Sequence, residues 1–114
     1  MPRDDAAYLL DMLLAARDAL SFTEGMSYEE FAHDRRTQLS VLKSVEIVGE
    51  AAAHVSEDTK RAHPAIPWQD IVGMRNRLVH AYFDIDLPVV WGTVCDDLPA
   101  LIARLEPLIP PETG

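Results

Sequence analysis

The segment Asp34–Val55 reads DRRTQLSVLKSVEIVGEAAAHV and contains no proline. Its apolar residues recur in alternating steps of four and three, at Val41, Val45, Val48, Ala52 and Val55. This period places them on one face, so the segment is predicted to be a long helix packed against others. Gly49 costs about 1 kcal/mol relative to alanine inside a helix, so we expect another helix to approach closely there.

Two helices are predicted before this segment. Residues 4–22 carry apolar side chains at steps of three and four, and Thr23-Glu24-Gly25 ends that pattern. Ser27-Tyr28-Glu29-Glu30 then has the serine and glutamate spacing of a capping box, in which each side chain satisfies a free backbone N–H. A short helix is therefore expected to begin at this point.

The second half of the chain predicts three more helices. Ser56-Glu57-Asp58 is expected to cap a brief helix that runs to His63, and the prolines of 64–67 force an extended connection. The pattern then predicts a helix over 68–82. A last helix follows, with Asp86 as its cap and Pro88 in its first turn.

Proline also shapes that last helix. Pro99 is expected to kink it or to interrupt its hydrogen bonding, and the prolines at 107, 110 and 111 end it. No alternating strand pattern and no linker is found. The expected fold is all-α, an up-and-down bundle of four main helices plus short helices, with residues 1–114 forming one domain.

Composition restricts the classes of function. The chain has 19 acidic and 10 basic residues and a formal net charge of −9, which argues against a protein that coats nucleic acid. Any RNA contact must be local, and DNA is not expected as a partner. No apolar run approaches the roughly 20 residues needed to cross a bilayer, and the N-terminus lacks a secretory signal. A cytoplasmic protein with no membrane partner is expected. The lone Cys95 is interpreted as a side chain that packs against its neighbours.

The best clue to function is the cluster Met74–Tyr82, MRNRLVHAY. Arg75 is a permanent cation suited to phosphate, and His80 is able to donate or accept a proton near neutral pH. Asn76 is suited to orienting the histidine or holding a phosphate oxygen. Together they indicate phosphodiester chemistry.

The geometry of that cluster favours two copies of the chain. On a helix, Asn76 and His80 share one face while Arg75 and His80 lie about 140° apart. A symmetric dimer would bring two arginines and two histidines into one cleft. Arg77 is interpreted as a surface charge and as a possible RNA contact.

Other polar residues are weaker candidates. The histidines show none of the short spacings of zinc sites, so no metal and no cofactor is expected; they are His33, His54, His63 and His80. Glu46 and Glu50 lie one turn apart and are suited to acid–base work, but such pairs are usually solvated. Trp68 and Trp91 are expected to be core or dimer anchors rather than platforms for bases.

Several blocks of the chain resemble the HepT-like group of the HEPN superfamily. The hallmark of that superfamily is an arginine, a polar residue and a histidine four to six positions after the arginine, matched by Arg75, Asn76 and His80. The group extends it to Arg-x-x-x-x-His-x-Tyr, matched through Tyr82. Further similar blocks are 34–38, 46–51, 66–68 and 74–86.

The resemblance implies an all-α dimer with metal-independent ribonuclease activity, acting as the toxin of a type VII-like toxin–antitoxin pair. The antitoxin of such pairs, MntA, resembles a minimal nucleotidyltransferase, and the tyrosine of the motif is the site of adenylylation. By that match Tyr82 is the modified residue.

Two other classes of function stay open. The first is a catalytically inactive helical dimer that acts as a binding partner of a nucleotidyltransferase, which the acidic balance of the chain favours. The second is a purely structural dimer, in which the polar cluster would have no clear use.

Overall fold

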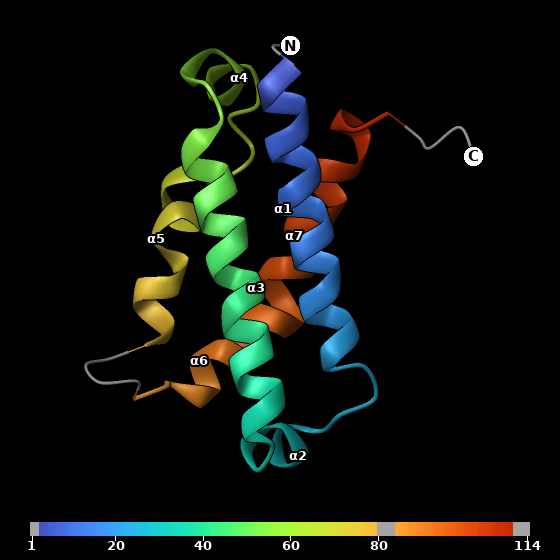
Figure 1. Ribbon diagram of the computed structural model, residues 1–114, viewed down its shortest axis with the longest axis vertical. Coiled ribbons are helices and arrows are strands. Elements are labelled where there is room, and N and C mark those ends of the chain that lie inside the picture. The colour runs from blue at the N-terminus through green and yellow to red at the C-terminus, as the bar shows by residue number, and fades with distance from the viewer. Residues whose placement is uncertain (1–2, 80–83, 111–114) are drawn as a thin grey trace.

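The helix α3 is the element around which the others pack. The computed structural model describes residues 3–79 and 84–110 (Figure 1). α3 spans Arg35–His54, and the carboxylate of Asp34 caps it by accepting a hydrogen bond from the backbone N–H of Thr37 at 3.0 Å. That hydrogen bond holds the pKa of Asp34 below its ordinary value. The predicted seam is buried, which confirms the helix: Val41, Val45, Val48 and Ala52.

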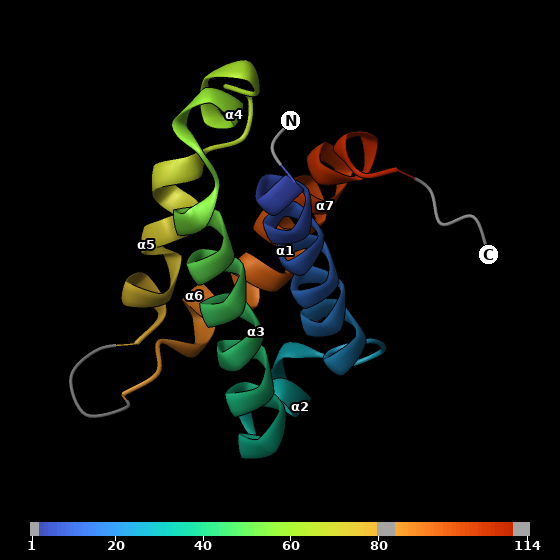
Figure 2. The ribbon, with the colours of Figure 1, turned by 45° about the horizontal axis from the view of Figure 1, so that its top comes forward.

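The helix α1, Arg3–Phe22, lies antiparallel beside α3 (Figures 1 and 2). Its buried residues recur at steps of three and four, at Leu9, Met12, Ala16 and Ala19. The helix predicted over 4–22 is confirmed. The chain then turns through Gly25, whose φ of 77° lies in the left-handed region that favours glycine.

The short helix α2, Tyr28–Ala32, closes one end of the bundle. The predicted capping box is present: Glu30 N–H donates to the Ser27 hydroxyl, and Ser27 N–H donates to the Glu30 carboxylate. Phe31 is fully buried, and the side-chain amide of Gln38 donates to its carbonyl at 3.0 Å. This buried amide ties α2 to the first turns of α3.

The helix α4, Glu57–Ala62, is tied to the start of α1 by a buried carboxylate. Asp5 is 2% exposed, and it accepts hydrogen bonds from Ser56 N–H at 2.9 Å, from the Ser56 hydroxyl at 2.6 Å and from the Thr59 hydroxyl. The bonds from the side chains of Ser56 and Thr59 lower the pKa of Asp5 from its ordinary value of 3.8, against the opposing effect of burial.

The helix α5, Trp68–Leu78, crosses α3 at Gly49. A Cβ atom at Gly49 would lie 3.3 Å from the carbonyl oxygen of Ile71 and 3.4 Å from that of Val72. The backbones of α3 and α5 therefore meet with no side chain between them. The close approach predicted at Gly49 is confirmed.

The end of α5 differs from the sequence-based prediction. The helix stops at Leu78 instead of continuing to residue 82. Val79 has φ −126° and ψ 122°, and it forms an antiparallel bridge with Ile85. Asp86 N–H donates to the carbonyl of Leu78 at 2.8 Å. Pairing with the segment just after the turn thus replaces the next helical turn, and the prediction is wrong at Val79.

The C-terminal helix is continuous but changes its hydrogen bonding before Pro99. It consists of α6 (Leu87–Gly92), the π-helical turn η2 (Thr93–Asp97), α7 (Leu98–Leu105) and the 3₁₀ turn η3 (Glu106–Leu108). Asp86 caps it, as predicted, and Leu98 N–H donates to the Thr93 carbonyl, five residues back. The expected interruption near Pro99 is confirmed as a π turn. Cys95 is exposed rather than packed, because Thr93 and Val94 take the buried side of that turn.

The four long segments α1, α3, α5 and α6–α7 run up and down around one buried apolar cluster (Figure 1). α7 packs against α1, which closes the bundle on the side away from α5 (Figure 2). Apart from the Val79–Ile85 bridge, the described residues contain no β structure. The predicted all-α fold is confirmed. Within residues 3–79 and 84–110, no helix has both the length and the apolar character needed to span a membrane.

We expect Gly49→Leu to lower the free energy of unfolding by about 1–3 kcal/mol, because leucine forms helices well and the loss must come from overpacking against α5. Gly73→Ala is the matched control, since a Cβ there would meet nothing within 4 Å. It should stabilise the protein by roughly 0.5–1 kcal/mol. Urea unfolding measures both, and equal effects of the two changes would contradict the close contact.

We expect Asp5→Asn to destabilise the protein at neutral pH by an amount that shrinks in acid. A carboxyl whose pKa is lowered on folding contributes stability above its unfolded pKa and loses it as the pH falls through the folded value. The difference from wild type should therefore close below pH 3.8. Unfolding curves across that range measure it, with the exposed neighbour Asp4→Asn as the control. A difference that is constant with pH would contradict this role.

Candidate functional site

The last turn of α5 presents three polar residues to solvent. The buried face of this helix consists of Trp68, Ile71, Met74 and Leu78. Arg75, Asn76 and Arg77 fall between these positions, and all three are exposed. The same packing that buries the apolar face of α5 therefore holds the arginines and the asparagine at the surface.

Arg75 faces α3. It lines a hollow of about 200 Å³, here called the Arg75 hollow, together with Leu39, Leu42, Lys43, Glu46, Val79 and Ile85. Its guanidinium makes no hydrogen bond or ion pair with any residue that the structure describes. An arginine that lines a hollow and has no partner among the described residues is available to bind an anion, and its planar donors match phosphate oxygens.

Arg77 differs from Arg75 in both direction and partners. It lies about 200° further around α5, and it lines a separate hollow of about 430 Å³ against η2 and α7 that also contains Asp96 and Asp97. Its guanidinium donates a hydrogen bond to the backbone carbonyl of Asp70 at 3.2 Å and lies 3.8 Å from the side-chain carboxylate of the same residue. The structure therefore does not bring the two arginines together, and the surroundings of Arg77 are acidic.

His80 and Tyr82 lie outside the described residues. The predicted angle between Asn76 and His80 assumed a helix through residue 82, and α5 ends at Leu78. The bridge between Val79 and Ile85 brings the two sides of this segment together, and both bridge residues line the Arg75 hollow. The chain thus leaves and re-enters the described structure beside Arg75.

Two charged residues of α3 share the hollow with Arg75. Lys43 Nζ lies 3.8 Å from a carboxylate oxygen of Glu46. Lys43 was not predicted, because the apolar pattern of α3 does not show which of its exposed residues face α5. Glu50 lies instead in another hollow, with Asp11 and His54. The two glutamates considered for acid–base work therefore do not share a hollow.

The remaining candidates have structural surroundings. Trp68 is 8% exposed and donates its indole N–H to the carbonyl of His63 at 3.1 Å, while Trp91 packs on Phe31 with ring centroids 5.2 Å apart. Both tryptophans belong to the core or pack against it, as expected. No three His, Cys, Asp or Glu side chains among the described residues are grouped so as to hold a metal ion.

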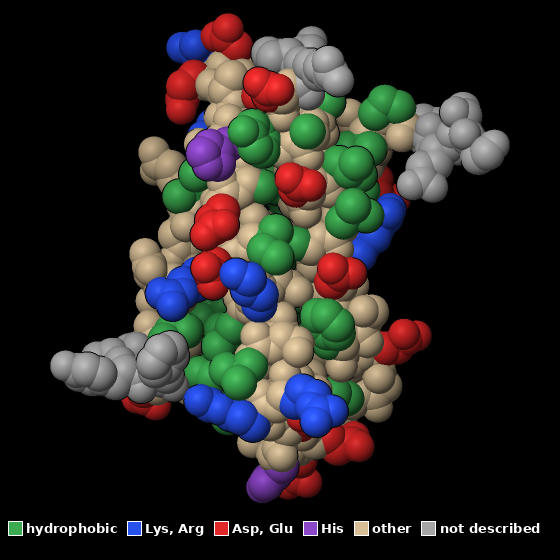
Figure 3. Space-filling view, in the orientation of Figure 1, with side chains coloured by type: hydrophobic (Ala, Val, Ile, Leu, Met, Phe, Trp, Pro, Cys, Tyr) green, Lys and Arg blue, Asp and Glu red, His purple; other side chains and the backbone are tan. Residues whose placement is uncertain are grey.

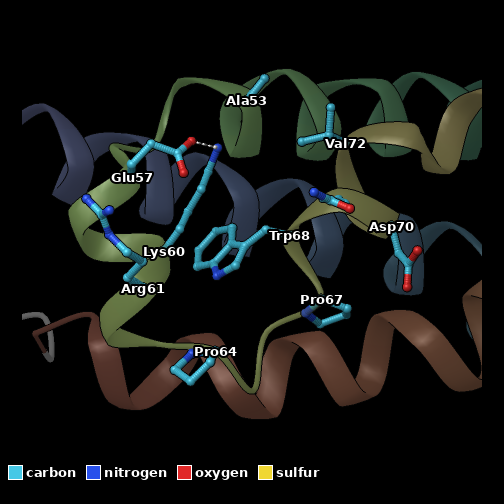
Figure 4. A pocket seen from close by; sticks show the side chains of 10 residues that line it. Ala53, Glu57, Lys60, Arg61, Pro64, Pro67, Trp68, Asp70 and Val72 are labelled. Atoms are coloured by element: carbon cyan, nitrogen blue, oxygen red, sulfur yellow. Dashed lines mark ion pairs between the residues drawn. The ribbon is translucent and has the colours of Figure 1, made fainter.

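A larger hollow of about 800 Å³ lies at the opposite end of α5, between α4 and Trp68 (Figure 4). Its cations are paired: Lys60 lies 3.8 Å from Glu57, and Arg61 lies 2.7 Å from Asp58. Because each positive charge already has a carboxylate partner, this hollow is less suited to an anion than the Arg75 hollow, despite its size.

Comparison with known proteins places the chain in a family. It matches the model of the "Ribonuclease HepT-like" family over residues 12–108, and it belongs to that family. It is 41% identical over 108 residues to a protein of Thermococcus cleftensis named "Probable ribonuclease HepT", covering 95% of this chain and 98% of that one. The resemblance inferred from the sequence blocks is therefore confirmed.

Two proteins of Methanocaldococcus jannaschii, both named "Putative RNase", are also similar to the chain. One is 36% identical over 104 residues, covering 91% of this chain and 95% of the relative. The other is 36% identical over 110 residues, covering 96% and 91%. No solved structure gave a significant match.

Proposed function

We propose that this protein is a metal-independent endoribonuclease that cleaves RNA at a site built from Arg75, Asn76 and His80. The observation that carries the proposal is that Arg75 lines a hollow and its guanidinium has no partner among the described residues. The names of its relatives, which describe ribonucleases, support RNA as the substrate.

The roles follow from the chemistry of RNA cleavage. The ribose 2′-OH attacks the adjacent phosphorus, a proton leaves that hydroxyl, another proton reaches the leaving 5′-oxygen, and negative charge builds on the phosphate. Arg75 stabilises that charge through charge-assisted hydrogen bonds. His80 transfers protons, and Asn76 orients His80 or holds a phosphate oxygen. No cofactor is required for these steps.

We place the site in a homodimer of this single domain. A two-fold axis near the end of α5 would bring two copies of Arg75 and His80 into one cleft, so that two histidines divide the acid and base roles. Support comes from two large apolar side chains left exposed on α1 outside the hollows that contain Arg75 and Phe22: Leu10 and Leu14. These give the chain apolar surface that self-association would bury.

The biological setting proposed is a toxin–antitoxin pair in the cytoplasm. The partner is a minimal nucleotidyltransferase of the MntA type, which transfers AMP from ATP to the hydroxyl of Tyr82 and releases pyrophosphate. A bulky anion two residues from His80 would block the cleft and repel the phosphate of the substrate. The motif match at Tyr82 supports this assignment.

A second candidate is a catalytically inactive helical dimer that binds the nucleotidyltransferase. The net charge of −9 favours it, since an acidic protein is a poor general ligand for RNA. The cleavage experiment below separates the two candidates.

We expect purified protein to cleave single-stranded RNA in EDTA. His80→Ala should lower the rate about 100-fold or more, and Arg75→Ala about 100-fold or more through lost charge stabilisation. Arg77→Ala is the matched control from the same helix and should lose at most a few-fold. Gel analysis of labelled RNA measures the rates, with circular dichroism to confirm folding. A folded wild type that leaves RNA intact would favour the inactive binding partner, and activity lost in EDTA and restored by a divalent ion would refute metal independence.

Incubation with an MntA-type nucleotidyltransferase and ATP should add AMP to the protein and abolish cleavage, because the modified residue is two positions from His80 in the sequence. Intact-mass spectrometry measures the adduct. The Tyr82→Phe variant is the control and should remain unmodified. An unchanged wild-type mass, or an adduct that persists in Tyr82→Phe, would refute Tyr82 as the site.

A further inference from the structure

Positive side chains gather over the N-terminal half of α3, beside the hollow that contains Arg75. Figure 3 shows Lys and Arg side chains surrounding an apolar patch on this part of the surface. Arg36 and Lys43 are both exposed there, and together they line a hollow of about 490 Å³ between α3 and the end of α1. We call this the α1–α3 hollow.

The α1–α3 hollow adjoins the Arg75 hollow. Leu39 and Lys43 line both of them, so the two form one continuous surface. Arg36 and Lys43 are seven residues apart, which places them about 10 Å apart along α3 and on nearly the same face. The cations therefore follow a line from Arg36 through Lys43 to Arg75.

Apolar and aromatic side chains are interleaved with these cations. Leu39 is 46% exposed, and Phe22, the last residue of α1, is 43% exposed and lines the same hollow as Arg36 and Lys43. Exposing an aromatic ring to water is unfavourable unless something covers it. Surfaces that bind single-stranded nucleic acid usually combine cations along the path of the phosphate backbone with aromatic rings on which bases stack.

The negative charges near this line are few. Asp18 is the one carboxylate lining the α1–α3 hollow, against the two cations Arg36 and Lys43. Glu46 lies 3.8 Å from Lys43, in an exposed pair of the kind that contributes little and yields readily to a phosphate. The described linings of the two hollows together carry three cations, Arg36, Lys43 and Arg75, against the two carboxylates Asp18 and Glu46. The lining is therefore slightly positive on a chain that is acidic overall.

We propose that the α1–α3 hollow is a subsite for single-stranded RNA adjoining the scissile linkage. Arg36 and Lys43 bind the phosphates next to the one held by Arg75, and Phe22 stacks one base. This inference rests on the proposed ribonuclease function and extends it to a longer substrate. A second copy of the chain is a poorer occupant, because a two-fold interface centred here would bring the cations of one copy close to those of the other.

The test uses a fluorescent 2′-O-methyl RNA, which lacks the attacking hydroxyl and is not cleaved, with fluorescence anisotropy as the readout. Arg36→Glu/Lys43→Glu should weaken RNA binding about tenfold or more. It should also lower the slope of log affinity against log salt concentration by the contribution of about two phosphate contacts. Phe22→Ala should weaken binding about tenfold. All three side chains are exposed, so the variants should fold. Arg17→Glu/Arg61→Glu is the control, with the same change in charge on other surfaces.

A cleavage assay separates this subsite from the catalytic groups. Arg36→Glu and Phe22→Ala, which change residues outside the Arg75 hollow, should raise KM for a long RNA and leave cleavage of a dinucleotide unchanged, since a dinucleotide does not reach the α1–α3 hollow. Three results would overturn the subsite. The double variant could bind RNA as tightly as the wild type, the control could lose as much affinity as the double variant, or light scattering could show that the substitutions convert a dimer to a monomer. If the wild type neither binds nor cleaves any RNA, both the ribonuclease function and the subsite are refuted. If the wild type cleaves the dinucleotide but the variants bind and cleave long RNA as well as the wild type does, only the subsite is refuted.

Discussion

The contact between Gly49 and the backbone of α5 is the constraint on which the site depends. A side chain at this position would press on the carbonyl oxygens of Ile71 and Val72, so glycine lets the two helices meet backbone to backbone. Arg75 lies one turn further along α5 and Glu46 one turn back along α3, and both line one hollow. A wider separation of α3 and α5 would remove the wall that Lys43 and Glu46 give to this hollow. The direction of the arginine is thus a consequence of how two helices pack.

The distribution of charge explains how an acidic chain could act on RNA. Charges more than about 10 Å apart are largely screened at physiological salt, so the net charge of −9 matters less than the groups near the phosphate. Arg17, Lys60 and Arg61 each lie close to a carboxylate. Arg75 has no such partner among residues 3–79 and 84–110, and it lines a hollow. Local surroundings, rather than total charge, therefore decide whether Arg75 is able to bind a phosphate.

Local sequence signals predicted most of the fold, and contacts that helical periodicity does not show account for the differences. The valine seam of α3, the capping box at Ser27 and the Asp86 cap are encoded within a few residues, and each is present in the structure. The end of α5 did not show in the apolar pattern, because Val79 leaves the helix to pair with Ile85, six residues further on. The motif identified Arg75, but periodicity could not reveal which residues of α3 face it. Lys43 became visible only once α3 and α5 were packed together.

The most direct test of the central claim is NMR observation of the arginine side chains during titration with the non-cleavable RNA. If Arg75 holds the phosphate, its Nε–Hε resonance should shift in a saturable manner at the same RNA concentration that saturates binding. The resonance of Arg77, which is engaged with Asp70, should stay nearly unchanged. Saturable RNA binding with no response at Arg75 would contradict its assignment as the residue that binds phosphate.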